Sequence, residues 1–189
     1  MDYYGHGPLI DLDRPLCITG FMGARVEATA KSIAALAGVP VVELDREVEH
    51  RSGKSLSHLV LKEGEPRRRA LELEALERAI SGRPKVIALG DGALLTAKAA
   101  DLVAAKATLV YLEWSLVELA NSVRERLKEN PGRYPELLLQ DKPTALGLSP
   151  MLQERVPSYT RADFRVQGKG QPPWKLAQEI LAWLQGGPV

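Results

Sequence analysis

Short apolar segments alternate with longer segments of helical period along this chain, and this alternation restricts the fold more than any other feature. A parallel sheet covered by helices produces such a pattern, because each buried strand is followed by a helix that packs on the sheet. The sequence therefore predicts an α/β fold of three layers, with a central five-stranded parallel sheet. The expected strands are Leu16–Thr19, Val39–Leu44, Lys85–Leu89, Ala107–Leu112 and Phe164–Gln167.

Between these strands, apolar residues recur at spacings of three and four, as in amphipathic helices. The pattern is clearest after Pro66, where leucines alternate with charged side chains. The expected helices are Glu27–Ala37, Glu47–Glu63, Pro66–Ile80, Leu94–Ala105, Ser115–Lys128 and Trp174–Leu184.

Residues 129–150 interrupt this rhythm. They contain three prolines before Pro150, two glycines and mixed charge. Long segments of this kind in compact α/β domains often act as mobile lids, so we expect a lid-like loop here. A plain surface loop fits the composition equally well.

The charge balance limits the partners of the chain. Its 25 Lys and Arg residues against 24 Asp and Glu leave a formal net charge of +1, so no overall field attracts nucleic acid or an anionic membrane. We expect neither partner, and any anion site must be local. With 189 residues and 45% hydrophobic composition, residues 1–189 are expected to form a single domain, with residues 1–15 as an N-terminal extension.

The sequence also predicts the cellular location of the protein. No segment has the ~18–20 apolar residues of a membrane span, and residues 1–15 lack the basic-then-apolar pattern of a secretion signal. The single cysteine, Cys17, lies in an apolar run and is expected to be a small core residue. These features predict a cytoplasmic protein.

The segment Gly20–Glu27 lies between the first expected strand and the first expected helix. A phosphate-binding loop in this place reads G-x-x-x-x-G-K-[ST]: backbone N–H groups face the phosphates, the lysine bridges them and the hydroxyl holds magnesium. Gly20 fits the first position. However, Arg25, Val26 and Glu27 stand where the second glycine, the lysine and the hydroxyl are required.

Two further observations weaken a nucleotide site in this loop. Lys31 lies well into the expected helix, so it cannot serve as the loop lysine. Glu27 places a carboxylate in the first helical turn, which favours the helix dipole but repels a triphosphate. From these residues alone, a tight strand-to-helix connection remains the simpler interpretation.

Several motifs occur in a fixed order. Gly20–Ala24 reads GFMGA and Val41–Asp45 reads VVELD, and the match from Gly20 to Asp45 needs no insertion or deletion. Further motifs lie at residues 52–55, 63–69, 90–92, 110–112 and 154–159. Together, over about residues 16–184, they resemble the shikimate kinase family. The resemblance implies a P-loop NTPase fold like that of nucleoside monophosphate kinases, with substrate-binding helices at about residues 46–80 and the lid at about 129–150.

The resemblance assigns an acceptor site to residues that this chain keeps. Asp45 corresponds to the family aspartate that binds the shikimate hydroxyls, and it is the candidate catalytic residue. Arg69 and Arg155 correspond to arginines that bind the shikimate carboxylate. A guanidinium group suits this role because it can bind both carboxylate oxygens. Gly90 and Gly92 belong to a turn where the backbone meets the substrate closely.

Other interpretations of these residues remain open. Asp45 also fits a helix N-terminal acid, and Arg69 also fits a solvated helix face. Asp91 replaces the middle glycine of the turn, where it could act as a base or metal ligand or could block an anionic ligand.

The implied nucleotide site is less complete. Arg124 lies near the position of the family's adenine-contacting arginine, and Arg133 corresponds to the lid arginine that reaches ATP. Glu43 corresponds to an acid that helps hold magnesium, but without a loop hydroxyl the metal site is incomplete. The implied nucleotide-binding residues are Gly20, Gly23, Ala24, Arg25, Arg124 and Arg133.

Three functions are compatible with this sequence. We favour a shikimate-kinase-like protein that has lost normal ATP-dependent phosphotransfer and retains a pocket for a small carboxylate, such as shikimate or an analogue. The alternative is an active or weakly active shikimate kinase, with ATP and magnesium as cofactors and Arg25 as the substitute cation. A third hypothesis is an enzyme with a different reaction, in which Glu43, Asp45 and Asp91 form a carboxylate cluster for metal binding or acid–base catalysis.

Overall fold

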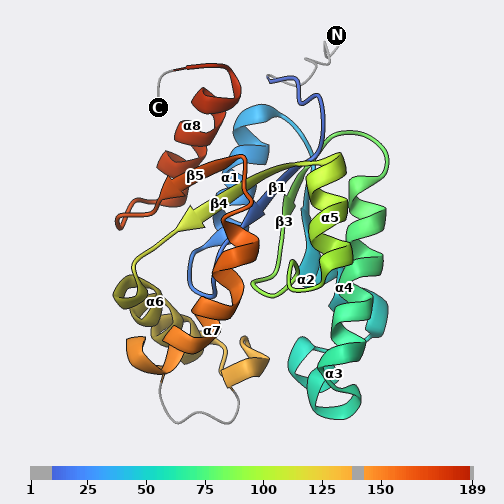
Figure 1. Cartoon of the computed structure of the whole chain (residues 1–189), viewed down its shortest axis with the longest axis vertical. Helices are drawn as coiled ribbons and strands as arrows, with labels where there is room; N and C mark the ends of the chain where they lie inside the picture. The colour runs from blue at the N-terminus through green and yellow to red at the C-terminus, as the bar shows by residue number, and fades with distance from the viewer. Residues whose placement is uncertain (1–9, 138–142, 188–189) are drawn as a thin grey trace, which may run out of the picture.

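The computed structural model describes residues 10–137 and 143–187, and its centre is one parallel sheet with the strand order β2-β3-β1-β4-β5 (Figure 1). This confirms the predicted five-stranded parallel sheet. The predicted bounds of the first and last strands are also confirmed. The strands are β1 (Leu16–Thr19), β2 (Val41–Glu43), β3 (Val86–Ala88), β4 (Thr108–Glu113) and β5 (Phe164–Gln167).

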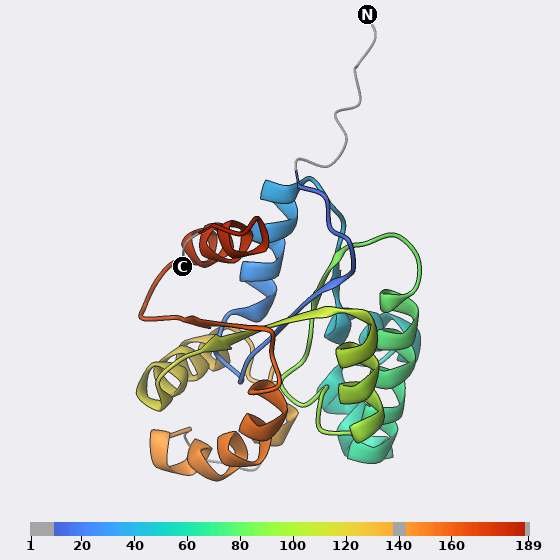
Figure 2. The ribbon, with the colours of Figure 1, turned by 45° about the horizontal axis from the view of Figure 1, so that its top comes forward.

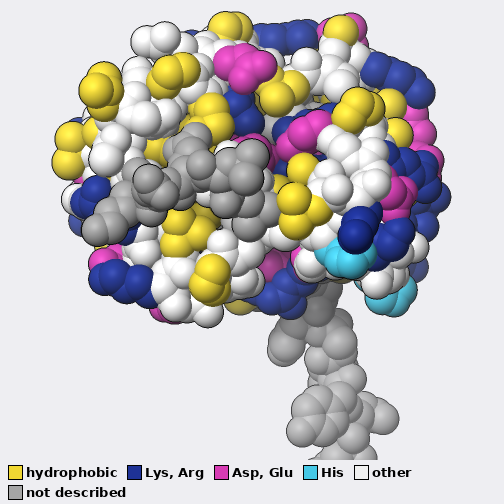
Figure 3. Space-filling model, turned by 90° about the horizontal axis from the view of Figure 1, so that it is seen from below, with side chains coloured by type: hydrophobic (Ala, Val, Ile, Leu, Met, Phe, Trp, Pro, Cys, Tyr) yellow, Lys and Arg dark blue, Asp and Glu magenta, His cyan; other side chains and the backbone are white. Residues whose placement is uncertain are grey.

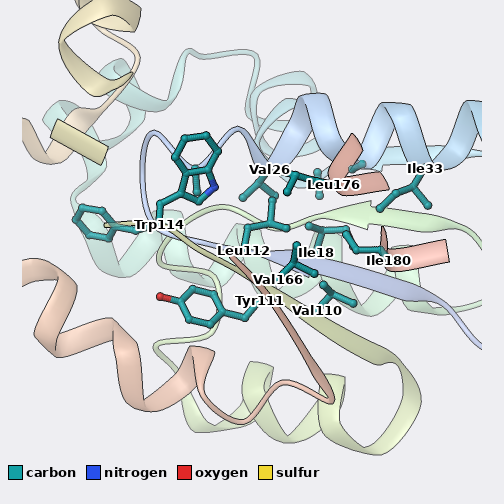
Figure 4. Close-up of a cluster of buried hydrophobic side chains, with 14 of the residues drawn as sticks. Ile18, Val26, Ile33, Val110, Tyr111, Leu112, Trp114, Val166, Leu176 and Ile180 are labelled. Atoms are coloured by element: carbon teal, nitrogen blue, oxygen red, sulfur yellow. The ribbon is translucent and has the colours of Figure 1, made fainter. Parts of the chain in front are cut away.

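Helices cover both faces of the sheet, as Figure 2 shows. Successive side chains of a strand point to opposite faces, so Leu16 and Ile18 of β1 enter one core and Cys17, fully buried, enters the other. The first core lies under α1 (Val26–Ala37) and α8 (Pro173–Leu184), and Figure 4 shows its side chains. The second lies under α4 (Glu65–Ile80) and α5 (Ala97–Lys106).

The remaining helices lie at the carboxyl ends of the strands, and α3, α6 and α7 occupy the lower half of Figure 1. Open α/β sheets bind ligands outside this edge, where the strand order reverses. Here the order reverses at β1, because β3 and β4 flank it on opposite sides. These elements are α2 (Leu44–Ser52), α3 (Leu56–Glu63), α6 (Leu116–Glu129), the 3₁₀ turn η1 (Pro135–Leu137) and α7 (Ala145–Tyr159).

The single helix predicted over Glu47–Glu63 is instead two helices, α2 and α3. Gly53 ends α2 with φ 65°, a left-handed conformation that glycine adopts without steric cost. Ser55 then caps α3, its hydroxyl accepting a hydrogen bond from the His58 N–H at 3.2 Å. The apolar spacing continues through this break, so periodicity alone could not reveal it.

Part of the predicted lid-like loop is helical. α7 begins at Ala145, where the Thr144 hydroxyl caps it by accepting from the Gly147 N–H at 3.0 Å. The helix contains Pro150 and Pro157, residues that normally interrupt helices. Residues 138–142 of the expected lid lie outside the described residues.

The end of the predicted N-terminal extension packs on the domain. Leu12 is buried, and the Pro15 carbonyl accepts a hydrogen bond from the Thr108 N–H of β4 at 2.9 Å. Residues 1–9 lie outside the described part of the chain. Within the ranges described, no helix has both the length and the apolar character that crossing a bilayer requires.

Candidate ligand-binding site

A cavity of about 370 Å³ lies at the carboxyl ends of β1 and β3, a size that suits a small molecule. Residues Gly20–Glu27 line it on one side, α2 contributes Asp45 to it, and residues 132–136 face it from the lid region. Figure 3 views the molecule from this end, where Lys and Arg side chains are interspersed with Asp and Glu. The cavity therefore contains charges of both signs.

Two residues of the loop Gly20–Glu27 adopt positive φ angles. Gly23 has φ 88°, and its carbonyl accepts a hydrogen bond from the Ser122 hydroxyl at 2.7 Å. Arg25 precedes α1 with φ 58°, a left-handed conformation that costs a residue with a side chain about 1–2 kcal/mol. Its side chain is exposed and borders the cavity. The conformation suited to glycine is thus retained without glycine.

Glu27 occupies the first turn of α1, where a helix N-terminus attracts anions. Its Oε2 atom accepts a hydrogen bond from the Arg133 guanidinium and lies 3.9 Å from Arg126 Nη1. These two arginines come from the lid region and from α6, so the loop, the lid region and α6 meet at one carboxylate. A protein carboxylate thereby neutralises two cations beside the N-terminus of α1.

Asp45 lies in the first turn of α2 and lines the cavity. Its Oδ1 atom is inaccessible to solvent and has no hydrogen-bond partner among the described residues. A Cβ atom added at Gly90 would lie 2.6 Å from this oxygen, so glycine is needed there. Burial raises the pKa of Asp45 to about 7, against the opposing effect of the Arg68 charge.

The raised pKa of Asp45 makes stability depend on pH. The pKa of Asp45 is about 7 in the folded state, against an ordinary value of 3.8. The contribution of Asp45 to the free energy of unfolding is therefore fully present below pH 3.8 and is lost as the pH rises through 7, because ionisation is unfavourable in the folded state. Each pKa unit corresponds to at most about 1.4 kcal/mol, less here because the residue is partly exposed. Urea unfolding at pH 5 and pH 8 should show that Asp45→Asn loses less stability over this interval than the unsubstituted chain. Equal losses would contradict the assignment.

Three arginines lie beside the cavity, and of these only Arg68 lines it. Arg68 is 2% exposed, and it contacts Glu72 at 2.9 Å and Glu136 at 2.5 Å. Arg69 also contacts Glu72, at 2.7 Å, and its guanidinium lies against Gly92, where a Cβ atom would overlap it. Arg155 is buried in α7 and donates to the Met151 carbonyl at 3.1 Å.

The structure brings only part of the predicted site residues into one cavity. Arg124 instead contacts Asn121 and the Pro143 carbonyl. Those that line the cavity are Gly20, Gly23, Ala24, Arg25, Asp45, Gly90 and Arg133. Those that do not line it are Glu43, Arg69, Gly92, Arg124 and Arg155.

Comparisons with known proteins agree with this fold. The shikimate kinase family model matches residues 22–185. The chain belongs to the shikimate kinase family. The shikimate kinase of Thermobifida fusca is 36% identical over 170 residues, covering 88% of this chain and 93% of the relative. That of Rhodopseudomonas palustris is 28% identical over 172 residues, covering 91% and 81%.

Solved structures of the shikimate kinase family are similar as well. Shikimate kinase from Acinetobacter baumannii in complex with shikimate has a TM-score of 0.82 and 25% identity, covering 92% of this chain and 93% of that one. Shikimate kinase from Bacteroides thetaiotaomicron has a TM-score of 0.78 at 23% identity, covering 91% and 98%, which shows the shared fold. The predicted P-loop kinase fold is therefore confirmed.

Val26 and Glu27 lack the ammonium group and the hydroxyl that a P-loop offers to phosphate and magnesium. Val26, at the lysine position, is 9% exposed and packs in the core under α1 (Figure 4). Glu43 is already paired with Lys31 at 3.1 Å and with Arg46 at 3.3 Å. In residues 10–137 and 143–187, no group of three His, Cys, Asp or Glu side chains could hold a metal ion, so the proposed metal cluster of acids is not found.

Sequence reasoning missed several charged residues of this shikimate kinase fold. Arg68 and Glu72 are four residues apart on α4, a spacing typical of helical ion pairs, so their contact could have been expected. Their burial could not, because charged residues at this spacing are normally exposed. The contacts of Glu136 with Arg68 and of Arg126 with Glu27 join residues distant in sequence and left no local signal.

Proposed function

We propose that this shikimate-kinase-like protein no longer transfers phosphate from ATP at a normal rate and retains a pocket for a small molecule. The contacts of the Glu27 carboxylate are the main support for this proposal. Its carboxylate occupies the helix N-terminus and pairs with Arg133 and Arg126. A phosphate entering there would face this negative charge and would have to replace it at both arginines, in a loop that offers no lysine.

The acceptor half of the cavity supports the retained pocket. The buried Oδ1 atom of Asp45 is free to accept a hydrogen bond from a ligand hydroxyl, and Gly90 leaves the adjacent backbone open to close contact. The A. baumannii relative binds shikimate, a hydroxylated carboxylate. Shikimate or an analogue is therefore the ligand that we propose first.

One observation favours the alternative of an active or weakly active kinase that converts ATP and shikimate to shikimate 3-phosphate. Arg25 keeps the left-handed conformation that suits glycine, and its exposed side chain borders the cavity. An arginine in this position could supply part of the missing positive charge, with ATP and magnesium as cofactors.

Separate calorimetric titrations with shikimate and with ATP plus magnesium test the two halves of the site. At pH 8, where Asp45 is ionised, we expect shikimate to bind and Asp45→Asn to weaken its binding at least tenfold, because the hydroxyl acceptor loses its charge. ATP is expected to show no saturable binding below millimolar concentration. Micromolar ATP binding by the unsubstituted chain would overturn the proposed loss of the donor site.

A further inference from the structure

Asp91 lies in the turn after β3 and points a carboxylate at the cavity wall. Its side chain is 10% exposed and lines the cavity. The Oδ2 atom lies 3.4 Å from Arg155 Nε, and the Oδ1 atom lies 4.0 Å from Arg68 Nη2. The Tyr159 hydroxyl donates to the Asp91 backbone carbonyl and fixes the turn. The carboxylate is therefore held between two buried guanidinium groups.

The neighbouring charges show what a ligand would meet there. Arg68 and Arg69 already face other carboxylates, and Glu72 contacts both. Arg155 faces Asp91 on its inner side, and on its outer side Glu154 lies 3.3 Å away. All three guanidinium groups thus have protein carboxylates as partners, so an anion that entered beside Asp91 would find each of them already paired.

The carboxylate of Asp91 would repel the carboxylate of an incoming ligand. Burial raises the pKa of Asp91 to about 6, with the Glu136 charge acting in the same direction and Arg155 opposing both. The group is still ionised at pH 8. Two carboxylates a few ångströms apart in a partly desolvated site repel each other strongly, whereas an uncharged hydroxylated ligand does not feel this repulsion.

We propose that Asp91 determines which ligand the cavity binds. Because the Asp91 carboxylate is already the anionic partner of Arg155, the cavity favours an uncharged hydroxylated ligand over the corresponding carboxylate. This inference rests on the ligand pocket of the proposed function and refines the class of its ligand. It does not depend on whether ATP binds.

Calorimetry at pH 8 with shikimate and its uncharged methyl ester tests the inference. The unsubstituted chain should bind the ester more tightly than shikimate. Asp91→Asn keeps the size of the side chain and removes its charge, so it should raise the affinity for shikimate at least tenfold relative to the ester. Glu154→Gln is the matched control: Glu154 pairs with the same arginine but its side chain is 66% exposed, so solvent should limit the change to less than twofold.

The outcomes separate the two proposals. If Asp91→Asn binds the ester but leaves the preference between ester and shikimate unchanged, the role of Asp91 is overturned and the pocket stands. If shikimate is already preferred by the unsubstituted chain, the role of Asp91 is overturned as well. Asp91→Gly provides a second variant, and thermal unfolding confirms which variants fold. If the folded variants bind neither ligand, both the pocket and the role of Asp91 are contradicted.

Discussion

Replacing Arg25, Val26 and Glu27 together by glycine, lysine and threonine is expected to raise the affinity for ATP with magnesium at least a hundredfold. Glycine removes the cost of the left-handed conformation at residue 25. Lysine adds the missing cation, and threonine supplies a hydroxyl while removing the carboxylate that pairs with Arg133. A preorganised charge in such a site contributes on the order of 3–4 kcal/mol, so a hundredfold change is a conservative expectation.

Single substitutions separate the contributions to this change. Glu27→Gln frees Arg133 and Arg126 but adds no cation, so calorimetry should show a smaller gain than in the triple variant. Arg25→Gly alone should mainly stabilise the fold, by about 1 kcal/mol in urea unfolding. A folded triple variant that binds ATP no better than the unsubstituted chain would show that the loop is not what prevents binding.

Arg68→Met is expected to destabilise the fold by about 3–5 kcal/mol. Arg68 is 2% exposed and contacts Glu72, which is also 2% exposed, together with Glu136. Removing the guanidinium leaves these carboxylates desolvated without a counter-charge, and breaking a buried ion pair on one side carries this cost. Urea unfolding at pH 7 measures the change.

Arg67→Met is the matched control for Arg68→Met. Arg67 is the preceding residue of α4, but its side chain is 50% exposed and its partner Glu63 is also accessible, so the loss of stability should be much smaller than for Arg68→Met. The double variant Arg68→Met with Glu72→Met should recover part of the loss, because both charges are then removed. Equal effects at the two arginines would contradict the buried role of Arg68.

Much of the fold could be predicted from the sequence because the strands are buried on both faces and the helices are amphipathic. The strand Leu16–Thr19 is apolar except for its last residue, and it is fully buried. The segment 145–159 could not be predicted as a helix, since its two prolines normally oppose one. Its stability comes from tertiary packing, with Leu148 and Tyr159 buried against other elements.

The candidate site was predictable only in part. The resemblance indicated Asp45 and Gly90, and the structure places both at the cavity. It did not indicate the partners of the charged residues, because Glu27 and Arg133 are 106 positions apart and no local pattern links them. Which guanidinium faces a ligand and which faces a protein carboxylate depends on such distant contacts.

Phosphate transfer from ATP to shikimate, measured with saturating magnesium and both substrates, tests the central claim most directly. The Arg25→Gly, Val26→Lys, Glu27→Thr variant serves as the comparison on the same scaffold. We predict that the unsubstituted chain forms shikimate 3-phosphate at least a hundredfold more slowly than this variant. Turnover by the unsubstituted chain in the range of typical enzymes, roughly 1–10³ s⁻¹, would contradict the account.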